Sequence, residues 1–385
     1  MIYLDHSATT AVDPRAVEAM APFWSEGYGN PSSIYGLGRR AAAALEDARV
    51  RVAGILNCQP REIVFTGCGT ESDNLAIRGV ASIQAARGRR HLITTPIEHH
   101  AVLHTIRDLV ERFDFEATYV PVDGNGLVDP VAVRAAIRPD TALVSVMYAN
   151  NEVGTVEPIV EVGAIAREHG IPFHTDAVQA GAYLSLDVQA LNADLLALSA
   201  HKFHGPKGVG LLYVRRGTRL APVQTGGSQE QGRRAGTENV PYVVGMARAL
   251  ELAHADREAE GIRLAALRDR LANGLLLRIP GAVITGHPTR RLPGHLSLVI
   301  PGIEAEGMLI GLDLLGVAAS SGSACATGAP TPSHVLTAMG LATADAMGAL
   351  RLTLGRENTA ADVDFVVEKL PEIVARLRGF SPAHV

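Results

Sequence analysis

The sequence has 385 residues, of which 47% are hydrophobic and 19% are charged, with a formal net charge of −5 at pH 7. This composition excludes a disordered or collagen-like chain, and at roughly 150 residues per domain the length favours two domains. The charge balance and an aromatic content of only 4% argue against nucleic-acid binding.

No apolar run reaches the roughly 18 to 20 residues that span a bilayer, and the first residues lack the pattern of a secretory signal peptide. We therefore expect a cytoplasmic protein that does not enter a membrane. The three cysteines, Cys58, Cys68 and Cys325, are too few for a disulfide framework and lack the spacing of a structural zinc site. We expect reduced thiols and no resident metal.

From residue 34 onward, helical periodicity alternates with short aliphatic and β-branched runs. Helices are predicted over 36–57 and from Thr70, and strands at 62–66, 91–95, 117–121, 142–149, 171–175, 194–199 and 209–214. This alternation is typical of a largely parallel sheet covered by helices on both faces. Ligands of such sheets bind beyond the carboxyl ends of the strands.

A long helical stretch at 245–279 is expected to lead from this unit to a smaller one. Beyond it, strands at 283–285, 295–300 and 350–354 mix with helices around 305–315 and 361–378. The predicted fold is therefore α/β, with a mostly parallel seven-stranded sheet between helices in a large domain, residues 13–255. Residues 1–12 and 256–385 are predicted to form a smaller α+β domain that carries the loop around Cys325.

A glycine-rich turn separates the strand at 62–66 from the next helix, which begins near Gly69 and Thr70. A helix start directs backbone N–H groups and the positive end of the helix dipole at one point, which suits a phosphate. An ordinary capped helix would show the same pattern.

Only three of the 35 basic residues are lysines, namely Lys202, Lys207 and Lys369. A lysine retained in an arginine-rich chain suggests a role that requires an amine, although chance would give the same result. Asp176 and Lys202 each follow a predicted strand, and either alone could be a solvated loop residue. Together they suggest pyridoxal phosphate, which needs a lysine for its aldehyde, a carboxylate for its ring nitrogen and a phosphate cradle, to which Ser199 and His201 can add donors.

Three further residues suit a reaction at the same edge of the sheet. His99 follows a strand, and an imidazole there can stack on a planar ring and move protons. Cys325 lies among glycines and small residues at 316–336, which favours a reactive thiol over a buried inert one. Arg351 can hold a substrate carboxylate, although an arginine in a strand is more often part of a surface ion pair.

The order of the motifs matches a known family almost from end to end. The motifs are YLDHSATT, GNPSS, GTESDN, ANNEVGT, HTDAVQ, AHKFHGPKGVG, GRRAGTEN, SSGSACATG and RLTLGR. By these motifs the chain resembles the cysteine desulfurases of the NifS/IscS type, which are class V, fold type I enzymes dependent on pyridoxal phosphate. The segment SSGSAC resembles the first of the two desulfurase groups.

The resemblance implies a role for each matching residue toward the cofactor. Lys202 would bind it covalently, Asp176 would pair with the ring nitrogen and His99 would stack on the ring. Gln179 and Asn151 would contact the phenolic oxygen. The phosphate would be held by Gly69, Thr70, Ser199, His201 and, from the second subunit of a homodimer, Thr237.

The resemblance also implies the reaction. Arg351 would bind the carboxylate of L-cysteine, with Asn151 and Asn30 near the substrate. Cys325 would take the sulfur as a persulfide, leaving L-alanine, and would pass it to an acceptor such as an iron–sulfur scaffold protein, whose cluster it could contact transiently.

Two other functions remain open from the sequence. A selenocysteine lyase or another β-eliminating enzyme would use the same Lys202, Asp176 and Arg351, but it would not explain the reactive Cys325. A sulfur-carrier scaffold without turnover would have no need to keep Lys202, Asp176 and His99.

Overall fold

The computed structural model describes residues 1–322 and 332–380, and its largest sheet has seven strands. In spatial order these are β2 (Ile63–Thr66), β8 (Gly210–Val214), β7 (Leu195–Ser199), β6 (Phe173–Asp176), β5 (Thr141–Ser145), β3 (His91–Thr94) and β4 (Glu116–Tyr119). All neighbours are parallel except that β8 is antiparallel to both β2 and β7. The predicted mostly parallel seven-stranded sheet is confirmed.

Helices cover both faces of this sheet, as expected for strands that are hydrophobic on both sides. Successive residues of β2 illustrate the alternation, since Ile63 and Phe65 belong to one core cluster and Val64 to the other. One face packs against α4 (Gly69–Ala85) and α5 (His100–Phe113). The opposite face packs against α3 (Gly36–Leu56), α6 (Pro130–Ala135), α7 (Ile159–Glu168) and the first part of α8 (Val240–Arg278).

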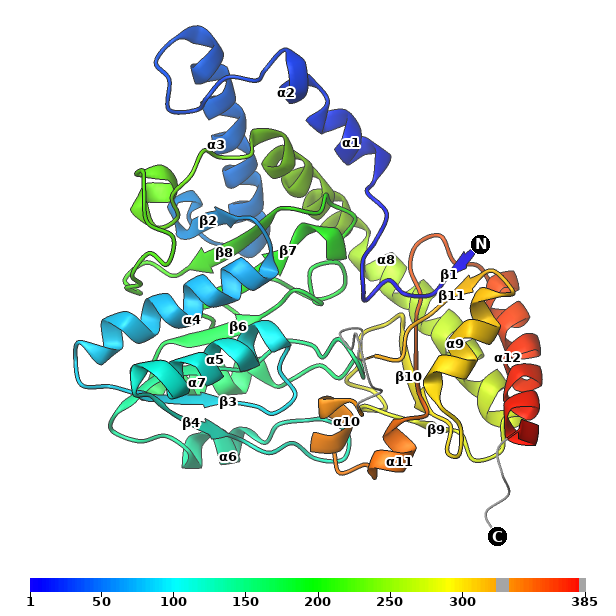
Figure 1. Cartoon of the computed structure of the whole chain (residues 1–385). Coiled ribbons are helices and arrows are strands. Elements are labelled where there is room, and N and C mark those ends of the chain that lie inside the picture. Colours follow the sequence, from blue (N-terminus) through cyan, green and yellow to red (C-terminus); the bar gives the residue numbers. More distant parts are fainter. Residues whose placement is uncertain (323–331, 381–385) are drawn as a thin grey trace.

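A smaller antiparallel sheet lies at the other end of α8 (Figure 1). Its order is β12 (Ala349–Thr353), β10 (His295–Val299) and β9 (Val283–Ile284), with α9 (Ala305–Asp313) and α12 (Ala360–Phe380) packed beside it. In α8, Met246 belongs to the core of the large sheet and Leu271 to that of the small one. The predicted boundary between residues 255 and 256 falls inside this helix, and the domain limits stay a prediction.

The N-terminal segment connects the two sheets. β1 (Ile2–Tyr3) pairs with β11 (Val317–Ala318), and Asp5 forms a bridge to Thr353 of β12. The chain then crosses to α1 (Pro14–Met20) and α2 (Pro22–Ser25) beside α8, as the blue trace in Figure 1 shows.

The remaining elements are short. They are α10 (His334–Ala338), α11 (Thr343–Ala346) and the 3-10 turns η1 (Pro60–Glu62), η2 (Ala200–Lys202) and η3 (Gln229–Gly232). Within residues 1–322 and 332–380, none of the helices combines the length and apolar character that crossing a membrane requires.

Candidate active site

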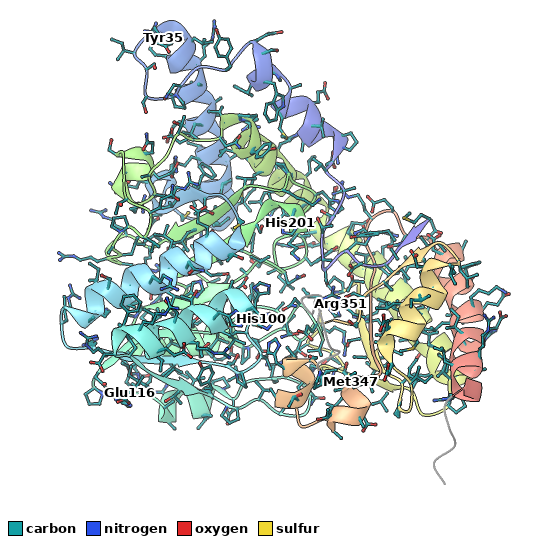
Figure 2. All side chains as sticks on the ribbon, in the orientation of Figure 1. Tyr35, His100, Glu116, His201, Met347 and Arg351 are labelled. Carbon is teal, nitrogen blue, oxygen red and sulfur yellow. The ribbon has the colours of Figure 1, made fainter. Side chains whose placement is uncertain are left out.

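A cavity of about 290 Å³ lies beyond the carboxyl ends of the large sheet, where the N-terminal segment and the small sheet approach it. Figure 2 shows His201, His100 and Arg351, three of its lining residues, near the middle of the molecule. The large sheet supplies one wall through the segments that follow its strands. β12 supplies Arg351 on another side.

The start of α4 forms one end of the cavity. Gly69 is needed there because a Cβ at this position would lie 2.8 Å from Val178 Cγ2 and 3.3 Å from Ser199 Cβ. The preceding residue, Cys68, caps the helix, with its sulfur 3.4 Å from the Glu71 backbone nitrogen. Gly69 and Thr70 therefore present the first N–H groups of a 17-residue helix to the cavity, next to Ser199.

His99 lies at the start of α5 and also caps that helix. Its Nδ1 accepts a hydrogen bond of 3.1 Å from the Ala101 backbone N–H, so the ring hydrogen is on Nε2. Burial lowers the pKa of His99, although the charge of Asp176 opposes this shift. The structure thus holds a neutral imidazole in one tautomer and one orientation at the cavity wall.

Asp176 ends β6 and is buried. Its Oδ1 accepts a hydrogen bond of 2.9 Å from the Val178 backbone N–H. Burial raises the pKa of Asp176, while His99 and Lys202 act in the opposite direction. A buried carboxyl with two nearby bases is suited to hold a protonated ring nitrogen.

Lys202 follows β7 in η2, and its Nζ donates hydrogen bonds to the carbonyl oxygens of Ser7 at 2.5 Å and Ala8 at 2.9 Å. Burial and the nearby Arg351 lower the pKa of Lys202 to about 8. The N-terminal segment therefore holds this amine of the cavity wall in a fixed position. His201 beside it is hydrogen-bonded through Nδ1 to Thr9 Oγ1 at 3.1 Å.

Arg351 is almost fully buried, with 3% of its surface exposed. Its Nη2 contacts Asp5 Oδ1 at 2.8 Å, and its Nη1 donates to the Asn151 carbonyl oxygen at 2.8 Å. Its Nε has no hydrogen-bond partner among the described residues. The guanidinium is thus rigidly held and retains an unused donor.

The cavity brings together most of the residues predicted from the sequence. Those that line it are Gly69, Thr70, His99, Asn151, Asp176, Gln179, Ser199, His201, Lys202 and Arg351. Asn30 and Thr237 do not line it and are exposed on loops of this chain. Cys325 lies outside the described residues.

Other lining residues were not predicted. They include Ser7, Ala8, Asp73, His100, Glu152 and His334. The N-terminal motif YLDHSATT contains the first two and was the available signal. Asp73 and Glu152 lie in the motifs GTESDN and ANNEVGT. His100 and His334 depend on tertiary packing: the Nε2–H of His334, for example, donates a hydrogen bond of 3.0 Å to the Glu98 carbonyl oxygen, 236 residues away.

Comparison with known proteins gives a consistent result. The family model for class-V aminotransferases matches residues 2–366. The chain belongs to this family. It is 52% identical over 381 residues to a protein of Methanosarcina thermophila named cysteine desulfurase IscS, covering 99% of this chain and 94% of that one. It is 47% identical to a protein of the same name from Clostridium botulinum strain Hall, covering 99% and 96%.

Solved structures agree. A structure described as a NifS-like protein matches with a TM-score of 0.91 and 40% identity, covering 98% of this chain and all of that chain. Another, described as SspA in complex with cysteine, matches with a TM-score of 0.81 and 36% identity, covering 92% and 99%. The resemblance to NifS/IscS-type proteins predicted from the motifs is confirmed.

Membership of this family implies pyridoxal phosphate, and the cavity fits that group. The helix start with its glycine-dependent close approach suits a phosphate, the buried Asp176 suits a ring nitrogen, and the Lys202 amine suits an aldehyde. In residues 1–322 and 332–380, no cluster of three or more histidine, cysteine or acidic side chains is arranged to hold a metal ion.

Proposed function

We propose that this protein is a cysteine desulfurase that removes sulfur from L-cysteine with the help of pyridoxal phosphate and releases L-alanine. The observation that carries the proposal is the convergence of Lys202, Asp176 and His99 on one cavity, with Arg351 on its other side. The names of the relatives support the same reaction class.

The cofactor would be held by residues already in position. Its phosphate would lie at the start of α4, with donors from Thr70, Ser199 and His201, and its ring nitrogen would face Asp176. Gln179 and Asn151 line the same cavity and would contact the phenolic oxygen. When bound, pyridoxal phosphate supplies an electron sink for the bonds broken at the substrate.

Lys202 moves the first proton. With a pKa of about 8, about one-tenth of its amine is unprotonated at pH 7, so Nζ can accept the proton from the substrate Cα. His99, neutral and carrying its hydrogen on Nε2, can give a proton to a substrate heteroatom on the same side of the cavity.

Arg351 orients the substrate. Its Nε is a donor that has no partner within residues 1–322 and 332–380, and a guanidinium binds a carboxylate through two parallel N–H groups. An amino acid held by its carboxylate at Arg351 and by its amino group near Lys202 directs its side chain into the remaining space of the cavity.

Cys325 would accept the sulfur. The Cys325 thiolate attacks the substrate sulfur, an S–S bond forms and the C–S bond breaks, and the electron pair of that bond stays on the substrate carbon, which is protonated to give alanine. Support comes from Gly322 and His334, on either side of Cys325 in the sequence, which both line the cavity.

The remaining parts of the proposal concern the assembly. We propose a homodimer in which Thr237 of one subunit reaches the phosphate of the other and Asn30 lies near the substrate. We also propose an acceptor protein such as an iron–sulfur scaffold and a cytoplasmic location.

The test is an absorbance spectrum of the purified protein between about 300 and 500 nm, before and after L-cysteine is added, with alanine and sulfide measured in the same sample. We expect a band near about 400 nm that changes on addition, with formation of alanine. Cys325→Ser should keep the band and lose at least about 99% of the alanine, whereas Cys58→Ser, a half-buried thiol away from the cavity, should keep both.

The outcomes separate the alternatives. A band without alanine from L-cysteine, but with alanine from selenocysteine, indicates a selenocysteine lyase. A protein that cannot bind pyridoxal phosphate contradicts the proposal and leaves a sulfur carrier without turnover.

A further inference from the structure

A second carboxyl lies on the cavity wall beside Asp176. Asp73, in the second turn of α4, is 1% exposed and lines the same cavity. The proposed function assigns the ring nitrogen to Asp176 and gives Asp73 no task. Two carboxylates in one buried site repel each other, so the charge on Asp73 matters for what Asp176 can do.

Asp73 faces His174. The distance from Asp73 Oδ1 to His174 Nε2 is 3.4 Å, and neither atom has a hydrogen-bond partner among the described residues, so that each is the nearby polar atom that could satisfy the other. His174 lies two residues before Asp176 on β6, so both side chains point to the same face of the sheet. Its other ring nitrogen, Nδ1, is 2.9 Å from Ser145 Oγ.

Counting hydrogens leaves three arrangements for this buried pair. A protonated Asp73 can direct its hydrogen at a neutral His174, whose Nδ1–H then donates to Ser145. Alternatively, a negative Asp73 faces the Nε2–H of a neutral His174, whose Nδ1 accepts from the Ser145 hydroxyl, or it faces a positive His174. The last two arrangements keep the charge of Asp73 close to that of Asp176 in a buried site, which is costly unless each charge is well paired. At 3.4 Å, one contact is poor compensation for an ionised carboxylate.

The surroundings favour the neutral arrangement. Burial, with the nearby Asp176 and Glu98, raises the pKa of Asp73 well above its usual range. Burial lowers the pKa of His174 to about 3. The ionisable groups that act on Asp73 are Asp176, Glu98 and Cys68, and those that act on Asp176 are His99 and Lys202.

Burial raises the pKa of both carboxyls, but His99 and Lys202 oppose this rise at Asp176, whereas Asp176 and Glu98 add to it at Asp73. The hydrogen bonds differ in the same sense. Asp176 Oδ1 accepts from the Val178 backbone N–H, whereas Asp73 Oδ1 has no hydrogen-bond partner among the described residues. Of the two carboxyls on the cavity wall, Asp176 is therefore the better placed to carry a charge.

We propose that Asp73 keeps its proton in the working enzyme and directs it toward His174 Nε2, so that Asp176 presents the only carboxylate charge of the two to the cofactor ring. Asp73 is thus a positioning residue, which acts through Asp176. The effect of Asp73 on the cofactor rests on the proposed function, whereas the protonation of Asp73 does not.

The first test is a pH titration of the absorbance band of the protein loaded with pyridoxal phosphate. Asp73→Asn keeps the shape and a donor to His174 but cannot ionise, so we expect its midpoint within about 0.3 pH unit of the wild type. Asp176→Asn, the matched change on the neighbouring carboxyl, should move the midpoint by about one unit or more. A shift of that size in Asp73→Asn would mean that Asp73 is ionised, and would overturn the proposal.

The second test needs no cofactor. The free energy of unfolding of the full-length apoprotein is measured against pH for the wild type and Asp73→Asn. A raised pKa in the folded state means that stability is lost as pH rises above the unfolded value. The advantage of Asp73→Asn should therefore grow from about pH 4 to about pH 7, and an advantage that shrinks with pH would show an ionised Asp73.

The control is Asp269→Asn, which removes an exposed carboxyl and should show little dependence on pH over this range. The two tests also separate the two proposals. A wild-type protein that does not bind pyridoxal phosphate contradicts the proposed function, while the slope in the apoprotein still decides the protonation of Asp73.

Discussion

The reactivity of a lysine depends on its surroundings, and Lys202 lies half-buried in the cavity wall against the carbonyl oxygens of Ser7 and Ala8. Burial removes hydration from the ammonium, and Arg351 adds a repelling charge, so the pKa falls to about 8. Two backbone carbonyls nevertheless hold the nitrogen in place. The result is an amine that is both oriented and partly unprotonated near neutral pH.

This predicts how cofactor binding depends on pH. The unprotonated fraction of Lys202 rises from about 10% at pH 7 to about 90% at pH 9. The rate at which apoprotein develops its band with excess pyridoxal phosphate should therefore rise about tenfold over this range and then level off. An equal rate at pH 7 and pH 9 would contradict the lowered pKa.

Two variants make this measurement specific. Lys202→Arg should give no covalent band, because a guanidinium stays protonated. Lys207→Arg, an exposed lysine five residues further on, should behave like the wild type.

At the scale of elements, α8 and α12 approach each other closely at Gly274. A Cβ at this position would lie 2.6 Å from Val367 Cγ1, whereas a Cβ at Gly261 of the same helix would meet nothing within 4 Å. Alanine is favoured over glycine in a helix by about 1 kcal/mol. The two glycines therefore differ only in what surrounds them.

We predict opposite effects for the two alanine variants in chemical unfolding. Gly261→Ala should raise the free energy of unfolding by about 0.5–1 kcal/mol. Gly274→Ala should lower it by about 1–3 kcal/mol, because a branched side chain in a packed interface cannot move away cheaply. Equal stabilisation by both would show that α8 and α12 are not in close contact.

The sequence predicted the elements better than their pairing. The long α8 was expected at 245–279 and lies at Val240–Arg278, because its periodicity extends over many turns. The antiparallel direction of β8 was not predicted, since a strand composition does not encode the direction of its neighbours. The two-residue strands β1 and β11 are too short to show any period.

The residues of the site also divide into those that the sequence predicted and those that only the folded structure shows. Residues at or just after the ends of strands, such as Asp176 and Lys202, were predictable because parallel strands end at a common edge. The contacts of Glu152 and His334 were not predictable, because a sequence, even the motif ANNEVGT that contains Glu152, does not say which distant residue each side chain touches. Ser333 Oγ contacts Glu152 Oε2 at 2.5 Å across 181 residues of sequence, and only the folded chain shows this.

At the scale of the whole molecule, Asp5 near the N-terminus contacts Arg351 of β12, which is 346 residues later in the sequence. Asp5 holds Nη2 of this arginine at 2.8 Å, yet Asp5 does not line the cavity. Its charge lowers the attraction of the guanidinium for a substrate carboxylate, while its oxygen keeps the side chain in position.

Asp5→Asn separates these two effects, because the amide oxygen can still accept from Nη2 but carries no charge. We predict that KM for L-cysteine falls by about three- to tenfold, with kcat changed by less than about twofold. Asp13→Asn is the control, since Asp13 pairs with Arg15 and Arg356 outside the cavity and should leave KM unchanged. A higher KM in Asp5→Asn would show that the charge orients Arg351 rather than competing for it.

The bridge between Asp5 and Thr353 also determines when, during translation, the site can be assembled. The ribosome makes the lysine and the helix start of the site long before it makes β12, so the earlier segments exist for some time without the opposite wall. Ser7 and Ala8 accept the hydrogen bonds of the Lys202 amine. They follow residues 2–5, which pair with β11 and β12. Residues 2–5 therefore lack these pairing partners until about nine-tenths of the chain has been made. A nascent chain thus cannot assemble the amine, its two carbonyl acceptors and Arg351 in one place, and a reactive aldehyde cofactor meets a finished site only in a nearly finished protein.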